Sequence, residues 1–122
     1  MVVVQNVALG TFSGAVHMDA VIDTGSTFCV VPPVFARLLG FDYSNRLEGR
    51  RVNVIGGGSV EMDMHRLEWV RVGSARAFGV MMGVAESFAG PGARKMLVGL
   101  TFIKQFRTIF DFNGDRVVFR SR

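Results

Sequence analysis

The sequence predicts an all-β domain, and three observations support this fold class. Short runs of β-branched and aromatic residues recur along the 122 residues, and segments that contain glycine separate them. Asn113 and Gly114 stand between two such runs, which indicates a β-hairpin. The chain is 49% hydrophobic and 20% charged, a composition typical of folded proteins. We therefore expect a single domain, residues 1–122, with one hydrophobic core.

The expected strands follow these runs in chain order. Valine-rich runs open the chain, a short run follows residues 23–26, and a long run lies beyond three consecutive glycines. Gly73 ends the long run, and residues 88–94, rich in glycine and alanine, form a loop before the next apolar run. The expected strands are 2–9, 13–22, 29–31, 51–55, 60–72, 77–82, 95–98, 108–112 and 116–120.

Two segments predict short helices instead of strands. Residues 32–40 begin with two prolines and end with Gly40, which suits the start and the end of a helix of about two turns. Residues 100–106 place Phe102, Ile103 and Phe106 on one helical face. The sequence therefore predicts a β domain with one or two short helices.

Charge and apolar patterning exclude several partners. The net charge is +4, but the basic residues are scattered and form neither a run nor a groove-reading helix, so no nucleic acid is expected to bind. No apolar stretch approaches the ~20 residues of a membrane-spanning helix, and the N-terminus lacks the pattern of a signal peptide. We expect a cytoplasmic protein with no membrane contact from this segment, and the chain can also be a domain of a longer protein.

No metal and no other cofactor is expected. Cys29 is the only cysteine, and its apolar neighbours predict a packed thiol. His17 and His65 lack the spacing of metal ligands, so both are expected at the surface. The seven methionines are expected to fill gaps in the core and at interfaces.

The most informative stretch is residues 22–26, Ile22-Asp23-Thr24-Gly25-Ser26. Such residues form ordinary turns, and a plain turn is one interpretation. They also suit the chemistry of a positioned carboxylate, because the Gly25 N–H and the Ser26 hydroxyl can each donate a hydrogen bond to Asp23. Some seventy residues later, Leu97-Val98-Gly99 precedes the second expected helix.

The order of these motifs resembles the retropepsin-like aspartic proteases, retroviral and cellular. The resemblance covers nearly the whole chain: an entry hairpin, residues 22–26, a proline-led helix, a glycine-rich hairpin, residues 97–99 and a terminal strand pair. It implies a closed β-barrel, a homodimer that cleaves polypeptides, and one Asp-Thr-Gly loop from each subunit. It also implies that the Thr24 hydroxyl bonds across the two-fold axis.

The chemistry of paired carboxylates explains why a second copy is needed. Two carboxylates a few Å apart cannot both ionise readily, so they share a proton; one then acts as general base and the other as general acid. Only Asp23 is followed by Thr and Gly, so its partner is expected to be Asp23 of a second chain. The alternative is a dimeric peptide-binding or oligomerisation module of the same fold that does not cleave peptides.

The resemblance also assigns the substrate-binding residues. The glycine-rich hairpin falls where the family has a flap that covers an extended peptide. The implied flap and pocket residues are Val30, Val54, Ile55, Gly56, Gly57, Gly58 and Leu97, with Arg94 and Lys95 at the rim. The sequence departs from many retroviral enzymes at Thr27 and Leu100, where those have an acidic residue and an arginine that pair. We therefore expect the dimer geometry near the site to differ from the retroviral pattern.

Overall fold

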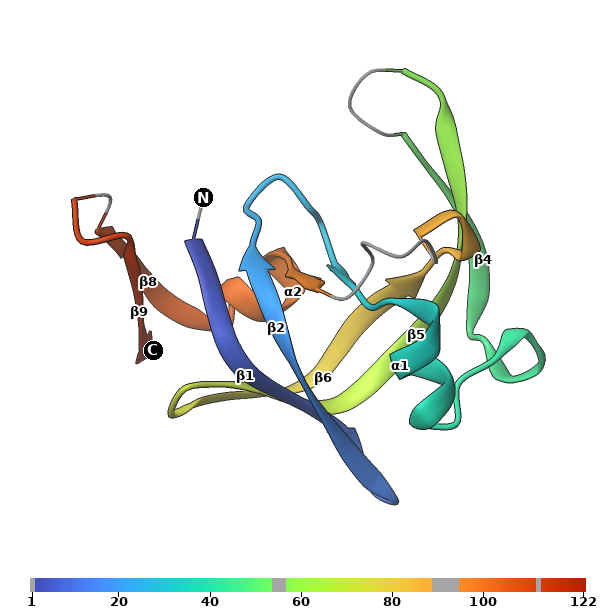
Figure 1. The fold of residues 1–122 in the computed structure, drawn as a ribbon, viewed down its shortest axis with the longest axis horizontal. Helices are drawn as coiled ribbons and strands as arrows, with labels where there is room; N and C mark the ends of the chain where they lie inside the picture. The colour runs from blue at the N-terminus through green and yellow to red at the C-terminus, as the bar shows by residue number, and fades with distance from the viewer. Residues whose placement is uncertain (1, 54–56, 89–94, 112) are drawn as a thin grey trace.

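The computed structural model describes residues 2–53, 57–88, 95–111 and 113–122 (Figure 1). These residues are mostly β-strand, with short helices between the strands. The strands are β1 (Val2–Thr11), β2 (Gly14–Ile22), β3 (Cys29–Val30), β4 (Glu48–Asn53), β5 (Ser59–Val72), β6 (Ala75–Val84), β7 (Met96–Val98), β8 (Phe106–Asp111) and β9 (Arg116–Ser121). The α-helices are α1 (Pro33–Leu38) and α2 (Leu100–Ile103), and the 3₁₀ helices are η1 (Tyr43–Asn45) and η2 (Glu86–Phe88).

Six of these strands close into a barrel, which confirms the predicted fold class. The strand order is β1-β2-β7-β3-β6-β5, and β5 pairs again with β1 where Leu9 faces Val70. The β2–β7 and β3–β6 pairs are parallel and the others antiparallel. β4 pairs only with β5 among the described strands, and the β4–β5 hairpin extends away from the barrel at the upper right of Figure 1.

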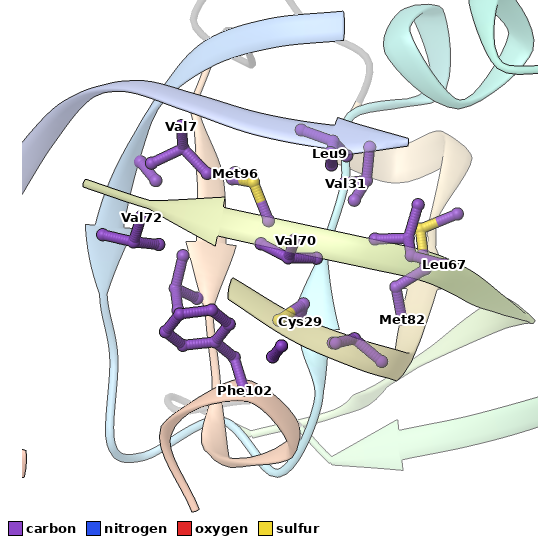
Figure 2. Close-up of a cluster of buried hydrophobic side chains, with 14 of the residues drawn as sticks. Val7, Leu9, Cys29, Val31, Leu67, Val70, Val72, Met82, Met96 and Phe102 are labelled. Atoms are coloured by element: carbon purple, nitrogen blue, oxygen red, sulfur yellow. The ribbon is translucent and has the colours of Figure 1, made fainter. Parts of the chain in front are cut away.

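The core fills the interior of this barrel. Figure 2 shows its centre, where side chains from β1, β3, β5, β6 and β7 meet Phe102 of α2. Phe102, Leu9, Leu67 and Met82 are fully buried, and a buried side chain of this size contributes about 1.5–3 kcal/mol of hydrophobic stabilisation. Cys29 lies in the same cluster, and burial raises the pKa of its thiol, in agreement with the predicted packed cysteine.

The C-terminal strands form a separate two-stranded sheet. β8 and β9 pair only with each other among the described strands, and they lie beside β1 at the left of Figure 1. The contact between Phe119 of β9 and Phe102 of α2 attaches this hairpin to the barrel core, and the two rings meet edge-on at 5.2 Å. Within the hairpin, the Phe119 ring lies 5.7 Å from that of Phe106. The opposite face of the hairpin leaves Ile109 and Val118 exposed.

Helix α2 is shorter than the sequence predicts. It ends at Ile103, and Phe106 is the first residue of β8 instead of the last of a helix. The helical spacing of Phe102 and Phe106 does predict that both are buried together, and their ring centroids lie 5.0 Å apart. Phe106 reaches the hydrophobic core equally well from a strand that begins after a tight turn and from a further turn of helix. The apolar spacing therefore did not distinguish a strand from a helix at this position.

Several strand bounds also differ by a few residues. Ser13 is a turn residue whose hydroxyl lies 3.1 Å from that of Thr11, so β2 begins only at Gly14. The terminal hairpin is present, and its last pair among the described residues is Asp111 with Arg116. The expected strand residues 54, 55 and 112 lie outside the described residues.

The expectation that His65 lies at the surface is wrong, whereas His17 is exposed as predicted. His65 is only 2% exposed, and its ring centroid lies 4.7 Å from that of Phe41, in the segment that follows α1. That segment lies against His65 and covers it. Burial lowers the pKa of His65, and the nearby carboxylates of Asp63 and Asp42 oppose this shift.

Candidate active site

Asp23 is the first residue after β2, and the barrel fixes its backbone. Ile22 pairs in parallel register with Val98 of β7, and the Asp23 N–H donates to the Val98 carbonyl at 3.0 Å. The chain then turns, because the Ser26 N–H donates back to the Asp23 carbonyl at 3.2 Å. The carboxylate therefore leaves the end of a barrel strand on a backbone that is hydrogen-bonded on both sides.

Two hydrogen bonds orient the Asp23 carboxylate. The Gly25 N–H donates to Oδ1 at 2.9 Å, and the Ser26 hydroxyl donates to Oδ2 at 2.8 Å. Each carboxylate oxygen thus accepts one local donor, as the sequence predicts. The Asp23 side chain remains partly exposed, so the carboxylate stays open to a ligand or a water molecule. Thr24, which stands between Asp23 and Gly25 in the sequence, is exposed.

The loop of residues 23–28, which we call the Asp23 loop, is joined to the segment around Gly99 through backbone atoms. At the start of α2, the N–H groups of Leu100 and Thr101 donate to the carbonyls of Ser26 and Thr27 at 2.9 and 3.1 Å. A Cβ atom at Gly99 would lie 2.7 Å from the Ser26 oxygen and nearer still to the Phe28 oxygen. We call the close contact between residues 26–28 and residues 99–101, with its two hydrogen bonds, the backbone junction. It holds the two motifs together without an ion pair between the side chains at positions 27 and 100.

A pocket of about 320 Å³ opens beside Asp23. Its lining residues come from the Asp23 loop, β3, the β4–β5 hairpin and β7; they are Asp23, Gly25, Ser26, Thr27, Phe28, Val30, Val52, Asn53, Met62 and Leu97. Apart from the residues of the Asp23 loop and Asn53, the lining is apolar. The arrangement places one carboxylate at the edge of a hydrophobic pocket, which suits a ligand with both polar backbone and apolar side chains.

The structure brings together part of the predicted site. Asp23, Gly25, Ser26, Val30 and Leu97 all line the pocket, whereas Thr24 does not. Gly57 and Gly58 are exposed, have positive φ angles of 97° and 81°, and lie outside the pocket lining. The predicted residues Val54, Ile55 and Gly56, together with the rim residue Arg94, lie outside the described residues.

Phe28, Val52, Asn53 and Met62 also line the pocket, and sequence reasoning missed them. A partial signal was present for Met62, because Met62 and Met64 are two apart on a strand and so share a face. Nothing comparable identifies Phe28, which is brought to the pocket by the turn that follows Asp23.

Comparisons with known proteins agree with this architecture. The family model described as "Aspartyl protease" matches residues 8–102, so the chain belongs to the aspartyl protease family. A retropepsin-like aspartic protease from Rickettsia conorii has a similar crystal structure, with a TM-score of 0.60 and 18% sequence identity; the match covers 89% of this chain and 86% of that one. The chain thus has a retropepsin-like fold. No curated protein matches the sequence significantly.

The described part of the chain offers neither a metal-ligand cluster nor a membrane-spanning helix. Within residues 2–53, 57–88, 95–111 and 113–122, no group of three or more His, Cys, Asp or Glu side chains is placed to hold a metal ion. In the same residues, no helix has the length and apolar character needed to cross a membrane.

Proposed function

We propose that the protein is an aspartic endopeptidase whose active unit is a homodimer with one Asp23 from each chain. The observation that carries this proposal is the Asp23 carboxylate itself, held by Gly25 and Ser26 at 2.9 and 2.8 Å and open to an apolar pocket. Membership of the aspartyl protease family supports the reaction class.

In the proposed reaction, a water molecule lies between the two Asp23 carboxylates, which share one proton. The ionised carboxylate takes a proton from the water as the water oxygen attacks the peptide carbonyl carbon. The protonated carboxyl gives its proton to the carbonyl oxygen, which yields a neutral gem-diol. Proton transfer to the amide nitrogen then allows the C–N bond to break, and no covalent enzyme intermediate forms.

A second copy is the economical source of the second carboxylate. Other carboxylates of the chain already have local partners: Asp63 pairs with Arg46 at 3.1 Å, Asp111 pairs with Arg116 at 3.0 Å, and Asp42 caps η1. A two-fold axis beside Asp23 would place the residue next to its own copy. The exposed Thr24 is then available to hydrogen-bond across that axis, the role that the family resemblance suggests.

We further propose that the β4–β5 hairpin acts as the flap. Val52 and Asn53 of β4 and Met62 of β5 line the pocket, so the arms of this hairpin form one of its walls. An extended peptide would lie between the hairpin and the Asp23 loop as an added strand, held by main-chain hydrogen bonds, with alternate side chains in apolar pockets.

Replacement of the carboxylate tests the proposed chemistry. Asp23→Asn should reduce cleavage of a peptide library to background while the melting temperature stays close to the wild-type value. The matched control is Asp19→Asn, four residues earlier on β2, whose side chain accepts a long 3.4 Å bond from the Asn6 N–H and lies outside the pocket. Cleavage by a clean Asp23→Asn preparation would refute the proposal. Peptide binding without turnover by the wild type would favour the binding module.

Mixed dimers test the shared site directly. If wild-type and Asp23→Asn chains are mixed in equal amounts and allowed to exchange, about one quarter of the pairs contain two carboxylates. Activity at constant total chain concentration should then fall to about one quarter, whereas chains that act independently would retain about half. Sedimentation provides the companion measurement: an active species that is strictly monomeric would contradict the shared site.

A further inference from the structure

A second pocket, of about 190 Å³, lies between the α1–η1 segment and strands β5 and β6. We call it the His65 pocket, because His65 and Asp63 of β5 are among its lining residues. It shares no lining residue with the pocket beside Asp23, which Met62 of the same strand lines. Since successive residues of a strand point to opposite sides, the two pockets lie on opposite faces of β5. The His65 pocket is therefore a separate site.

His65 is the deeply buried polar side chain of this pocket. Among the described residues, none forms a hydrogen bond with its ring nitrogens. No fully inaccessible side-chain nitrogen in the described part of the chain lacks a partner, so the nitrogens of His65 are reached from the pocket. Burial lowers the pKa of His65, so at neutral pH one ring nitrogen is unprotonated and can accept a hydrogen bond. The pocket thus contains a buried acceptor that has no donor.

Asp42 supplies a second free acceptor close to this ring. Its Oδ1 accepts from the N–H groups of Ser44 and Asn45 at 2.8 and 3.2 Å, and also from the Ser44 hydroxyl. Its Oδ2 accepts no bond from any residue that the structure describes. The Asp42 carboxylate raises the pKa of His65 against the larger effect of burial, which places the carboxylate near the ring.

The charges around the pocket leave one negative charge uncompensated. Three carboxylates line it, those of Asp42, Asp63 and Glu86. Glu86 pairs with Arg37 at 3.0 Å, and Asp63 pairs with Arg46 at 3.1 Å. Asp42 has no basic partner within the described residues. Three carboxylates against two guanidinium groups give a net charge of −1, and the unpaired carboxylate is the one beside the neutral imidazole.

We propose that the His65 pocket binds a small primary amine in its ammonium form, which donates hydrogen bonds to His65 and to Asp42. An ammonium group carries three N–H donors and one positive charge, so it matches both acceptors and the net charge. The pocket is far larger than the ~15 Å³ that one water molecule needs, so a short alkyl chain fits beside the Phe41 ring, which also lines it. This site is independent of peptide cleavage.

A divalent metal ion is a poorer match for the same pocket. A structural zinc site uses four protein ligands and a catalytic one uses three. The described residues contain no group of three or more His, Cys, Asp or Glu side chains placed to hold a metal ion. Two of the three carboxylates at the pocket are also already paired with arginine. The free acceptors therefore suit a ligand that brings its own N–H donors.

Thermal unfolding of the whole chain with butylammonium chloride tests the site. Isothermal titration calorimetry gives the Kd, and at ten times that concentration Tm should rise by about 5 °C. The ligand controls, at the same ionic strength, are sodium chloride and tetramethylammonium chloride, which carries the charge without an N–H donor. Neither control should raise Tm comparably. If butylammonium produces no rise, or tetramethylammonium produces an equal one, the proposal is wrong.

Two variants locate the binding. His65→Phe removes the acceptor but keeps an aromatic ring against Phe41, and it should abolish the rise in Tm. Asp42→Asn keeps an oxygen that can cap η1 but removes the charge, and it should raise the Kd on the order of tenfold. The control is Asp115→Asn, which makes the same change of charge at an exposed residue outside the pocket lining and should bind as the wild type does.

The melting curve of each variant without ligand shows whether that variant is folded. If His65→Phe does not fold, Asp42→Asn alone still decides the question against Asp115→Asn. Weakened binding in the pocket variants together with unchanged binding in Asp115→Asn supports the proposal. An unchanged Kd in the folded pocket variants overturns it, as does an equal loss in Asp115→Asn, because the amine would then bind elsewhere or through net charge alone.

Discussion

Gly99→Ala is the substitution whose effect follows most directly from the structure. Gly99 has a φ of −99° and a ψ of −169°, which any residue can adopt, so the backbone conformation itself does not require glycine. The space does. The new Cβ atom would lie 2.7 Å from the Ser26 oxygen and from the Phe28 carbonyl carbon. Both are backbone atoms of the Asp23 loop, and neither can rotate away as the end of a side chain could.

The size of the effect follows from these distances. These two contacts are 0.7 Å shorter than the 3.4 Å at which ordinary contacts begin, and the contact with the Phe28 oxygen is shorter still, so the two segments must separate by at least several tenths of an ångström. Overpacking of this kind typically costs about 1–3 kcal/mol. Separation also weakens the Leu100 and Thr101 hydrogen bonds of the backbone junction, each of which contributes about 1 kcal/mol. We expect a loss of about 3 kcal/mol, which lowers Tm by about 10–15 °C in a domain of this size.

Thermal unfolding followed by circular dichroism is the appropriate assay. Gly14→Ala is the matched control, because no atom lies within 4 Å of a Cβ built there and its φ is not positive. That control should change the free energy of unfolding by less than about 1 kcal/mol, and in the stabilising direction. If Gly99→Ala melts within about 2 °C of Gly14→Ala, the steric reasoning is wrong.

Three further predictions concern the core and its titratable groups. Burial lowers the pKa of His65, so the unfolded chain binds a proton at a higher pH than the folded chain does. The free energy of unfolding should therefore fall as the pH drops below about 6.5. In urea titrations, His65→Phe should abolish that fall between about pH 7.5 and 5.5. The Cys29 thiol, with its pKa raised by burial, should react with a disulfide reagent on the order of a hundredfold faster in urea than in the native protein. Phe102→Ala should destabilise the fold by about 3–5 kcal/mol, whereas Phe12→Ala, at a side chain that is 93% exposed, should have little effect.

The parts of the structure that the sequence predicts are those that local interactions determine. The hydrogen bonds to Asp23 come from residues two and three positions later, so the sequence alone places their donors. The strands of the barrel follow from runs of β-branched residues, whereas the closed fold was predicted through the resemblance of the motifs to those of the retropepsin-like aspartic proteases.

The parts that were missed depend on contacts between distant segments. Phe28, Met62 and Gly83 meet because β5 pairs with β6 and the Asp23 loop folds over both; no pattern within any one segment shows this. His65 is buried because the segment containing Phe41 covers it, and that segment lies far from β5 in the chain. A strand periodicity describes which side chains share a face, and it does not tell whether both faces are covered.

The backbone junction between the Asp23 loop and Gly99 has a consequence for how such proteins diverge. Its hydrogen bonds run from main-chain N–H groups to main-chain carbonyls, so they are available to almost any side chains at positions 26, 27, 100 and 101. Drift at those positions leaves the junction intact, and only the glycine at its centre is barred from change by the space around it. Two proteins of this fold can therefore share few side chains and still hold the catalytic-loop main chain in the same way, so percentage identity is a poor measure of how similar their sites are.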